Sequence, residues 1–447
     1  MKKTSWRYLS LLGLAWWVGA ASAATITVNS ASQDIDPGGV CTLRGAVDAM
    51  NNGADTNSCT ATGAYGNDDT IRFNLGTATI TLGIAANNHI TVRTPLTIDG
   101  SGNDITLDGN NANRIFYAVN GCTALTIRRL TFRDGNSGAT NAVGGAIAVE
   151  ITSAPPNTLI VEDSVFIDNQ AHFFGGAIDI TDNNNLSTLL VKRSTFTNNA
   201  ASLFQGGAIW AYSATIRDST FSGNSAGTLG GAVRANDAEM TNSTFVNNTA
   251  NGFGGAIHTE SSLIATHLTL VNNSAPTGAA IHVVGTIAAP TIASLKNSLI
   301  VGGNGVTTAQ CEAGANATLD SGTNLEWRDG VNENSCNSST PVTTTVALLE
   351  DIVDTVLANH GGPTFTLALP DNSPAIDTGD PSVGLATDQR GQLRPQGNGP
   401  DLGAFEKQLL TPPTPIAAAS IPALGVWSLL ALLGLVPVAA CRARRRM

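Results

Sequence analysis

The chain repeats one pattern of apolar, polar and small residues between Phe132 and Ile281. A unit such as FTNNAASLFQGGAI has an apolar residue, usually an Asn three positions later, then a pair of small residues and Ile or Val. From Gly207 onward the second small residue recurs every 24 residues, at Gly231, Gly255 and Ala279. The apolar position is filled by Phe132, Phe166, Phe196, Phe221, Phe245 and Leu270.

A repeat of this length, built from short β runs, is typical of a solenoid, because one unit cannot bury its apolar face alone. The β runs are separated by Gly, Asn and Ser and leave no room for helical crossovers. Each strand should therefore pair in parallel with its equivalent one coil away, at about 4.8 Å. We predict an all-β fold, a right-handed parallel β-helix over residues 76–305.

The phase of the repeat predicts a role for each position. The Phe column should stack inside with Ile178, Ile209, Val233 and Ile257. The small pair should serve a corner where positive φ or close backbone approach excludes a Cβ. The Asn column should form a ladder, since Asn tolerates left-handed turns and its amide can bond to the same amide above and below. The ladder comprises Asn169, Asn199, Asn224, Asn248 and Asn273.

Composition agrees with a thin-layered scaffold. Aromatic residues make up 5% of the chain and charged residues 13%, and there are 47 Gly in 447 residues. The formal net charge is −11. Seven of the 23 basic residues lie in terminal segments that contain no Asp or Glu, which leaves the remainder more acidic still. A nucleic-acid partner is therefore not expected.

The two ends of the chain carry targeting patterns. Residues 1–23 combine Lys2, Lys3 and Arg7 with an apolar run and the small-residue site Ala21-Ser22-Ala23, as in a secretory signal peptide. Residues 409–420 form a Pro- and Thr-containing linker. The following apolar run is about long enough to span a bilayer and ends in an Arg cluster expected to stay cytoplasmic. A plain membrane anchor is the simplest interpretation.

The same tail, residues 421–447, resembles the IPTL-type sorting signals that bacterial exosortases process. The resemblance rests on Ile421, Pro422, Ala423 and Leu424, followed by Trp427, one apolar helix and terminal Arg residues, with Ala423 where Thr is usual. It implies a precursor anchored in the inner membrane of a Gram-negative bacterium. After cleavage near Ile421 by an exosortase-type partner, the protein would reach the cell surface or the medium.

Cysteine usage fits an oxidising compartment. The economical pairing joins Cys41 to Cys59 and Cys311 to Cys336, each closing a loop outside the regular repeats. This leaves Cys122 free and expected to be buried, with a reactive thiol as the alternative.

Both segments that flank the repeats resemble domains of bacterial surface β-helices. Residues 24–75 resemble the CSLREA domain through Cys41-Thr42-Leu43-Arg44-Gly45-Ala46, and Leu43, Ala46, Val47 and Met50 have the spacing of a short helix that plugs the first coil. A disulfide-containing extension is expected over 306–345. Residues 346–408 resemble the choice-of-anchor Q domain through DQRG and DLGAFE, and we expect them to cap the C-terminal end.

The C-terminal segment contains four carboxylates that suggest Ca²⁺, although pairing with Arg390 or Arg394 and turn formation are the more common roles of such residues. They are Asp377, Asp380, Asp388 and Asp401. We expect no other cofactor and no other metal, including at His258 and His282, where solvated histidines are the commoner case.

The repeats resemble the GGA(I/L/V) and FxxN units of polymorphic outer-membrane proteins, which are adhesins. This resemblance implies a surface-displayed β-helix of the pectate-lyase-like fold. Alternation along each strand sends the residue after GGAI outward, and with it the residue two positions later. These candidates for binding a polysaccharide or a host-surface ligand are Asp179, Trp210, Tyr212, Arg234, Asn236, His258 and Glu260. Alternatively, the inserts after Ile147 and Ile178 cover them.

A polysaccharide lyase or glycoside hydrolase is the alternative to an adhesin or an envelope structural component. A glycosidase needs two carboxylates about 5 to 9.5 Å apart. Asp179 and Glu260 should lie three coils apart, roughly 14 Å at this rise. Asp163 and Asp218 should lie roughly 10 Å apart, but Arg129 and Arg193 share their column and indicate a charge ladder. We therefore assign no catalytic residue and favour a non-enzymatic surface protein.

Overall fold

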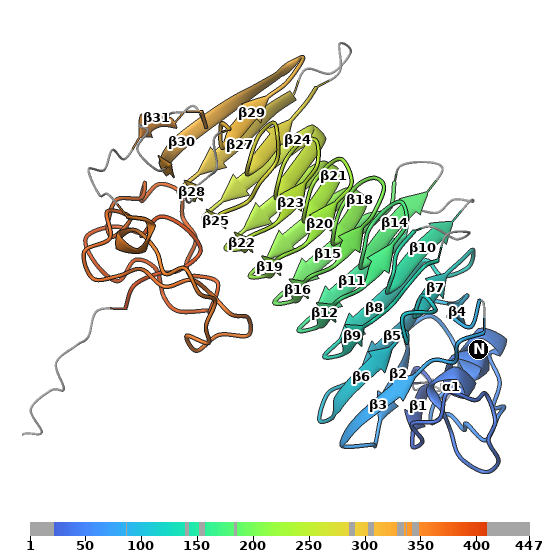
Figure 1. Cartoon of the computed structure of the whole chain (residues 1–447). Coiled ribbons are helices and arrows are strands. Elements are labelled where there is room, and N and C mark those ends of the chain that lie inside the picture. The colour runs from blue at the N-terminus through green and yellow to red at the C-terminus, as the bar shows by residue number, and fades with distance from the viewer. Residues whose placement is uncertain are drawn as a thin grey trace, which may run out of the picture. The chain divides into compact units, whose positions relative to one another are not determined.

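The protein is a parallel β-helix. The computed structural model describes residues 22–85, 87–138, 143–151, 157–182, 186–285, 291–302, 308–328, 335–336, 338–341 and 348–408. Every named pair of strands within them is parallel and joins equivalent strands of neighbouring coils, as in β18 (Ile209–Arg217) with β21 (Val233–Thr241) (Figure 1). The predicted fold class is confirmed.

Each coil contributes strands to as many as four stacks, which we name A to D in their order along a coil. Stack A begins at β4 and ends at β29. It contains β4 (Ile90–Val92), β7 (Phe116–Ala118), β10 (Ile147–Ile151), β14 (Ile178–Asp182), the first halves of β18, β21 and β24 (Ile257–Thr266), β26 (Ile281–Val283) and β29 (Cys311–Ala313).

Stack B follows on the same coils, and in β18, β21 and β24 it continues stack A without a break. It contains β1 (Thr25–Val28), β2 (Asp69–Phe73), β5 (Leu96–Asp99), β8 (Ala124–Arg128), β11 (Thr158–Glu162), β15 (Thr188–Lys192), the second halves of β18, β21 and β24, β27 (Thr291–Lys296), β30 (Ala317–Arg328) and β31 (Ser338–Pro341).

Stacks C and D complete the coil. Stack C contains β3 (Thr77–Thr81), β6 (Asp104–Asp108), β9 (Thr131–Arg133), β12 (Val165–Ile167), β16 (Thr195–Thr197), β19 (Thr220–Ser222), β22 (Thr244–Val246), β25 (Thr269–Val271), β28 (Leu299–Gly302) and the end of β30. Stack D is a four-stranded sheet of β13 (Gln170–Ala171), β17 (Ala200–Ala201), β20 (Ser225–Ala226) and β23 (Thr249–Ala250).

The core follows the predicted columns. From Phe132 to Phe245, successive rings stack with centroids 4.7–4.8 Å apart and planes within 4°. Each ring is fully buried, as are Ile178, Ile209 and Ile257. Aromatic pairs of this kind contribute about 0.5–1.5 kcal/mol beyond the burial of their surface. The stack therefore links the coils through the interior.

The Asn ladder is confirmed, and it is buried. Asn224 Nδ2 donates to Asn248 Oδ1 at 2.9 Å and to the Phe196 carbonyl at 3.0 Å. Its own Oδ1 accepts from the backbone N–H and the Nδ2 of Asn199. The same bonds recur from Asn169 to Asn273. One side chain thus satisfies backbone groups of the preceding coil and donates to the ladder amide of the next coil.

The residue with the left-handed conformation is the one before each ladder Asn. The prediction that the ladder Asn residues themselves adopt the left-handed turn is therefore wrong. The residues with positive φ are Asp168, Asn198, Gly223, Asn247 and Asn272. Another column of positive φ, formed by Arg129, Asp163, Arg193, Asp218, Asn242, His267 and Asn297, marks the corner between stacks B and C. The ladder residues are therefore Asn for their hydrogen bonds and not for their backbone angles.

The two members of the Gly pair have different roles. The first has positive φ, between 58° and 69° from Gly144 to Gly278. A Cβ on the second, for example on Gly231, would overlap the carbonyl oxygen of Gly255 in the next coil. Both predicted reasons for the pair are confirmed, one for each Gly.

A short helix closes the N-terminal end, as predicted. Helix α1 (Leu43–Asn52) begins after Thr42, whose side chain accepts from the Gly45 N–H, and ends at Gly53 with positive φ. Its residues Leu43, Ala46, Val47 and Met50 are buried.

Both predicted disulfides form, Cys41–Cys59 and Cys311–Cys336. Cys122 is free and buried, and burial raises the pKa of its thiol to about 12.

Residues 348–408, which include the 3₁₀ helix η1 (Leu349–Asp351), pack against the side of the coils through stack C. Ile352, Leu367 and Phe405 share an apolar cluster with Val271 and Leu299. We name this part the lateral segment. The lateral segment therefore lies along stack C, whereas we expected it to cap the C-terminal end of the β-helix (Figure 1).

Polar contacts attach the lateral segment to stack C. Gln389 bonds to the hydroxyls of Thr220 and Thr244 at 2.8 and 2.6 Å. Arg394 lies against His267 at 2.9 Å and pairs with Glu406 at 3.1 Å. The side chains of the DQRG motif and of Glu406 are therefore used to hold this segment together and to dock it.

The predictions for the two ends of the chain stay untested. Residues 1–21 of the expected signal peptide, and residues 409–447 with the linker and sorting signal, lie outside the described residues. Among the residues that the structure does describe, no helix has the length and apolar character needed to cross a membrane.

Candidate functional site

The predicted outward residues form a continuous column on stack A. Strand register places Tyr117, Ala148, Asp179 and Trp210 on successive coils. The column continues through Arg234, His258, His282 and Glu312. Alternation along the strand therefore gave the correct face for every member.

The expectation that this column is exposed is wrong for three of the candidates. Asp179, Arg234 and His258 are buried, with at most 6% of their surface exposed. Rings of the corner loop before the Gly pair pack on other members of the column: Phe174 lies 5.8 Å from Trp210 between ring centroids, and Phe253 lies 4.8 Å from His282. Parts of the inserts after Ile147 and Ile178 lie outside the described residues, so that alternative is untested.

Trp210, Arg234 and Glu260 form the centre of the column. The Arg234 guanidinium lies 4.8 Å from the centre of the Trp210 ring and contacts Glu260 Oε2 at 2.5 Å and Asn236 Oδ1 at 2.6 Å. The Trp210 indole N–H donates to Gln205. His258 and Arg234 lower the pKa of Glu260 to about 2. The charge of Arg234 is therefore balanced by Glu260, and its guanidinium lies over one face of the Trp210 ring.

The two histidines of the column contact each other rather than solvent. His258 Nδ1 and His282 Nδ1 are 3.0 Å apart, and His258 Nε2 lies 3.8 Å from Glu260 Oε1. Burial and the neighbouring His258 lower the pKa of His282 to about 4. His282 is therefore neutral at pH 7. The described residues contain no group of three or more His, Cys, Asp or Glu side chains arranged to hold a metal.

The remaining candidates lie at the edges of this column. Tyr212 and Asn236 are half-buried on stack A two positions after Trp210 and Arg234. Burial lowers the pKa of Arg114, and the negative charge of Asp179 acts in the opposite direction and raises it. These two groups therefore interact electrostatically. Asp179 is thus a partner of Arg114 rather than a free ligand for a sugar.

Sequence reasoning missed a cluster of aromatic residues on the corner loops between stacks D and A. Phe173 and Phe204 have centroids 5.4 Å apart, Phe174 and Phe204 5.8 Å, and Phe174 lies against Trp210. Phe204 is 41% exposed and its neighbour Leu203 47%. We name Phe173, Phe174, Phe204 and Trp210 the aromatic cluster.

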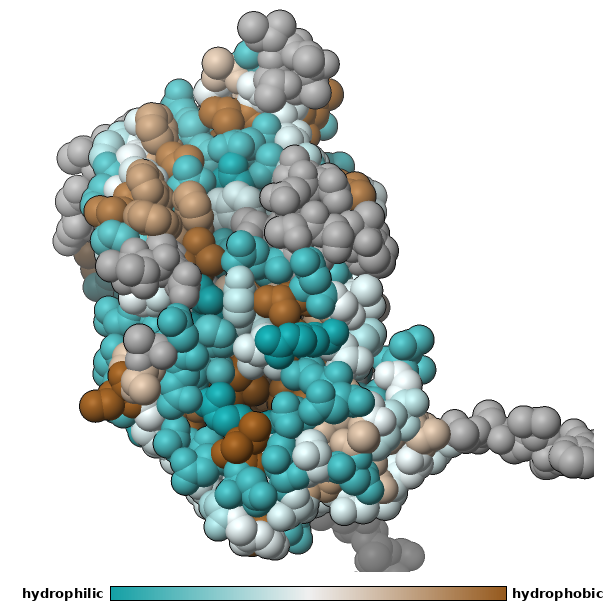
Figure 2. Space-filling view, turned by 90° about the vertical axis from the view of Figure 1, so that its right-hand side faces the viewer, coloured by the Kyte–Doolittle hydropathy of each residue, from teal (hydrophilic) through white to brown (hydrophobic). Residues whose placement is uncertain are grey.

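Exposed large apolar side chains occur at several places in the described residues, for example at Ile84, Ile292 and Val356, but in this cluster four rings contact one another. The face in Figure 2 is mainly hydrophilic, with separate small hydrophobic patches. The signal for the cluster in the sequence was the pair of motifs HFFGG and SLFQGG. It was overlooked because these Phe residues do not repeat in every unit.

The carboxylates weighed for catalysis are engaged elsewhere. Arg193 binds Asp163 through two contacts of 2.6 and 2.9 Å and lowers its pKa. Arg129 lies 3.9 Å from Asp163. The predicted charge ladder is confirmed at these three residues. Burial raises the pKa of Asp218, whose side chain lies 3.4 Å from Asn242 Nδ2.

One further carboxylate pair was not considered. Asp134 and Asp168 occupy equivalent left-handed positions on neighbouring coils, since the backbone N–H of Asp134 donates to Ile167 one residue before Asp168. Burial, Asp108 and Asp168 raise the pKa of Asp134, although Arg133 lies 3.8 Å away.

The four carboxylates suggested for Ca²⁺ are occupied by protein donors. Asp388 is fully buried and accepts from Arg390 at 2.7 Å and from the Glu406 N–H. Asp401 accepts from the backbone N–H groups of Asp377 and Lys407. Asp377 and Asp380 accept from Gly399 and Ser382. This is the turn and arginine pairing that we gave as the alternative.

The fold and this column define a repeat protein of the parallel β-helix class with an aromatic surface cluster. Two stretches, residues 218–236 and 242–260, match the repeat of the Chlamydia polymorphic membrane proteins. They include Arg234, Asn236, His258 and Glu260 of the column. The predicted resemblance to this family is thus confirmed for two repeats, while the CSLREA, choice-of-anchor and IPTL resemblances stay predictions. No curated protein matches the chain.

Proposed function

We propose that the chain is a surface-displayed β-helix of a bacterial envelope that binds a saccharide ligand without degrading it, as an adhesin does. The observation that carries this proposal is the aromatic cluster. Only 5% of the chain is aromatic, and most Phe residues serve the core. Four rings nevertheless gather on two neighbouring coils, where apolar surface is left in contact with water. Sugar rings have apolar C–H faces that such rings remove from water.

Surface display is supported by the match to repeats of a bacterial membrane-protein family and by the terminal sequence patterns. In this proposal the precursor is exported from a Gram-negative cell, held in the inner membrane by its tail and released by an exosortase-type enzyme. A mature protein that retains residues 421–447 would contradict the sorting step. A purely structural role in the envelope is the competing outcome.

A glycan array with the purified full chain tests binding. Phe204→Ala removes the most exposed ring of the cluster without touching the core, and we expect at least a tenfold loss of affinity. Ile264→Ala, at a 51% exposed position on stack B, is the matched control and should leave binding unchanged. Equal binding by both variants, or no glycan bound by the wild-type chain, would refute saccharide binding by the cluster.

A depolymerisation assay tests the enzymatic alternative, which the Asp134–Asp168 pair favours. A glycosidase uses one carboxyl with a raised pKa and one ionised carboxylate. Turnover of a polysaccharide that disappears in Asp134→Asn would replace the adhesin with a hydrolase. Absence of turnover with every glycan that the chain binds supports the proposal.

A further inference from the structure

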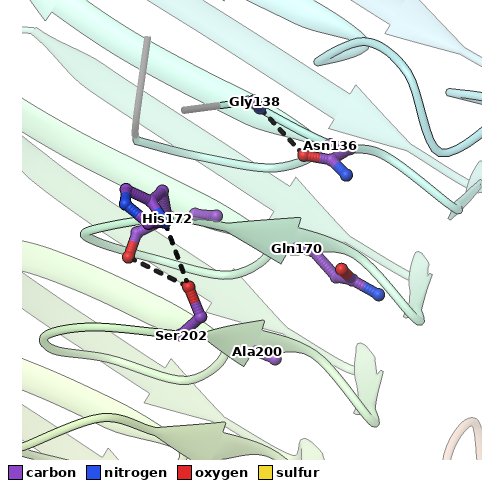
Figure 3. A pocket seen from close by; sticks show the side chains of 7 residues that line it. Asn136, Gly138, Gln170, His172, Ala200 and Ser202 are labelled. Atoms are coloured by element: carbon purple, nitrogen blue, oxygen red, sulfur yellow. Dashed lines mark hydrogen bonds between the residues drawn. The ribbon is translucent and has the colours of Figure 1, made fainter. Parts of the chain in front are cut away.

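An open pocket of about 280 Å³ lies on stack D (Figure 3). It spans three coils, because Asn136 forms a β-bridge with Gln170, and Gln170 pairs with Ala200. His172 and Ser202 form its wall on the side of the corner loops, and the Ser202 hydroxyl lies 3.4 Å from His172 Nδ1. The site is therefore built by the stacking of coils.

The polar atoms of the pocket are largely free to bind a ligand. Asn136 Oδ1 accepts from the Gly138 N–H. Within the described part of the chain, Asn136 Nδ2, both polar atoms of the Gln170 side chain and His172 Nε2 have no hydrogen-bond partner. The two amides lie on one side of the pocket and the imidazole on the other (Figure 3), and all three offer donors or acceptors. Hydroxyl and acetamido groups, which also donate and accept, are complementary to such a set.

The charge and size of the pocket restrict its ligand. Among the described residues that line it there is no Lys, Arg, Asp or Glu. An anionic ligand would find no cation, and a cationic ligand no carboxylate. A volume of about 280 Å³ is just below that of pockets for drug-sized molecules and suits a single ring.

The pocket is continuous with the aromatic cluster. The rings of His172 and Phe173 have centroids 4.9 Å apart, and Phe173 contacts Phe204. A saccharide with one residue in the pocket can therefore place the next residues over the aromatic rings. In this arrangement the pocket recognises the ligand through hydrogen bonds, and the aromatic cluster buries the apolar surface of the ligand.

We propose that this pocket binds one uncharged sugar residue, a hexose or an N-acetylhexosamine, of the saccharide that the aromatic cluster holds. This inference rests on the proposed function and adds the class of ligand and the residues that select it. Asn136 and Gln170 bind the hydroxyl or acetamido groups, and His172 offers its free nitrogen.

Saturation-transfer NMR on the full chain tests the proposal with four probes: glucose, galactose, N-acetylglucosamine and glucuronate. We expect at least one neutral sugar to bind and glucuronate to bind at least tenfold more weakly. Gln170→Ala should weaken the neutral sugar about tenfold, since it removes an amide that bonds to the ligand. Ala already occupies the same column at Ala200, so the coil accepts this change.

Two further variants make the result decisive. Thr249→Ala is the control, because Thr249 occupies the same column three coils from Gln170 and lies outside the pocket. Gln170→Glu keeps the shape and removes the donor, and it should weaken binding as Gln170→Ala does. Equal binding by wild type and Gln170→Ala, or glucuronate binding as well as the neutral sugars, would overturn the pocket assignment.

The failure of this inference can be told from failure of the proposed function. If glycan binding depends on Phe204 and not on Gln170, the aromatic cluster is the binding site and the pocket assignment falls. If the wild-type chain binds no glycan on the array and no sugar probe, both fall.

Discussion

Removal of one ladder amide should open the coils around it. In Asn224→Ala the backbone N–H and one Nδ2–H of Asn199 lose the oxygen that accepts them at 2.9 and 3.0 Å. Both donors belong to a fully buried residue. A buried donor left without a partner costs about 1–3 kcal/mol. Two such donors give a loss of about 4 kcal/mol in the free energy of local opening.

Hydrogen exchange measured by mass spectrometry on peptides covering residues 196–226 reports this opening directly. A loss of about 4 kcal/mol corresponds to exchange about 700-fold faster where exchange follows the opening equilibrium. Ser225→Ala changes the neighbouring, exposed residue and should alter the free energy by no more than about 0.5 kcal/mol. Exchange in Asn224→Ala within tenfold of that control would show that the ladder does not hold the coils together.

Two further predictions concern the backbone and a buried histidine. Gly231→Ala should destabilise the protein by roughly 3 kcal/mol, since its Cβ meets the Gly255 carbonyl oxygen. Gly223→Asn, at a left-handed position, should stay within about 0.5 kcal/mol; urea unfolding that ranks them equally would contradict this distinction. Burial and Arg394 lower the pKa of His267 to about 3. The unfolded chain, in which histidine has its ordinary pKa near 6.5, therefore binds more protons, and stability is lost as pH falls from about 6.5 to 3. His267→Asn should reduce that loss by about 1.4 kcal/mol per pH unit, and urea midpoints at pH 7, 5 and 4 that run parallel to wild type would refute this role.

The repeated columns could be predicted from the sequence because each makes the same contact in every coil. Phe221 meets another ring above and below, and Asn224 meets another amide. A stacked geometry of this kind converts a sequence period directly into contacts. The error about the left-handed residue had a similar origin. The position before the ladder holds Asp, Asn or Gly, all of which tolerate positive φ, but it varies more than the Asn that follows it.

The parts that were predicted poorly depend on contacts without a period. The lateral segment docks through Gln389, which bonds to Thr220 across 169 residues of chain. Nothing in the local pattern of residues 348–408 indicates which coils it will contact. The burial of Arg234 and His258 was missed for a related reason. Alternation tells which face of a strand a residue occupies, whereas burial depends on contacts with particular side chains, such as those of Arg234 with Trp210 and of His258 with His282.

The location of the aromatic cluster follows from where the repeat can vary. The Phe, Asn and Gly columns are fixed by contacts with both neighbouring coils, so a change in any of them disturbs three coils. In the corner loop between stacks D and A the coils are joined through backbone bridges, such as those of Gln205 with Phe174 and Leu229, so the side chains there can differ from coil to coil. Two residues separate Ala275 from Gly278, three separate Ala171 from Gly175, and four separate Ala201 from Gly206 in the loop that carries Phe204. Insertions at a corner add surface without altering the stacking of the core. A β-helix of this kind can therefore acquire a binding site by changing the residues and the length of its corner loops, and the aromatic cluster and the adjoining pocket occupy a corner that varies in both.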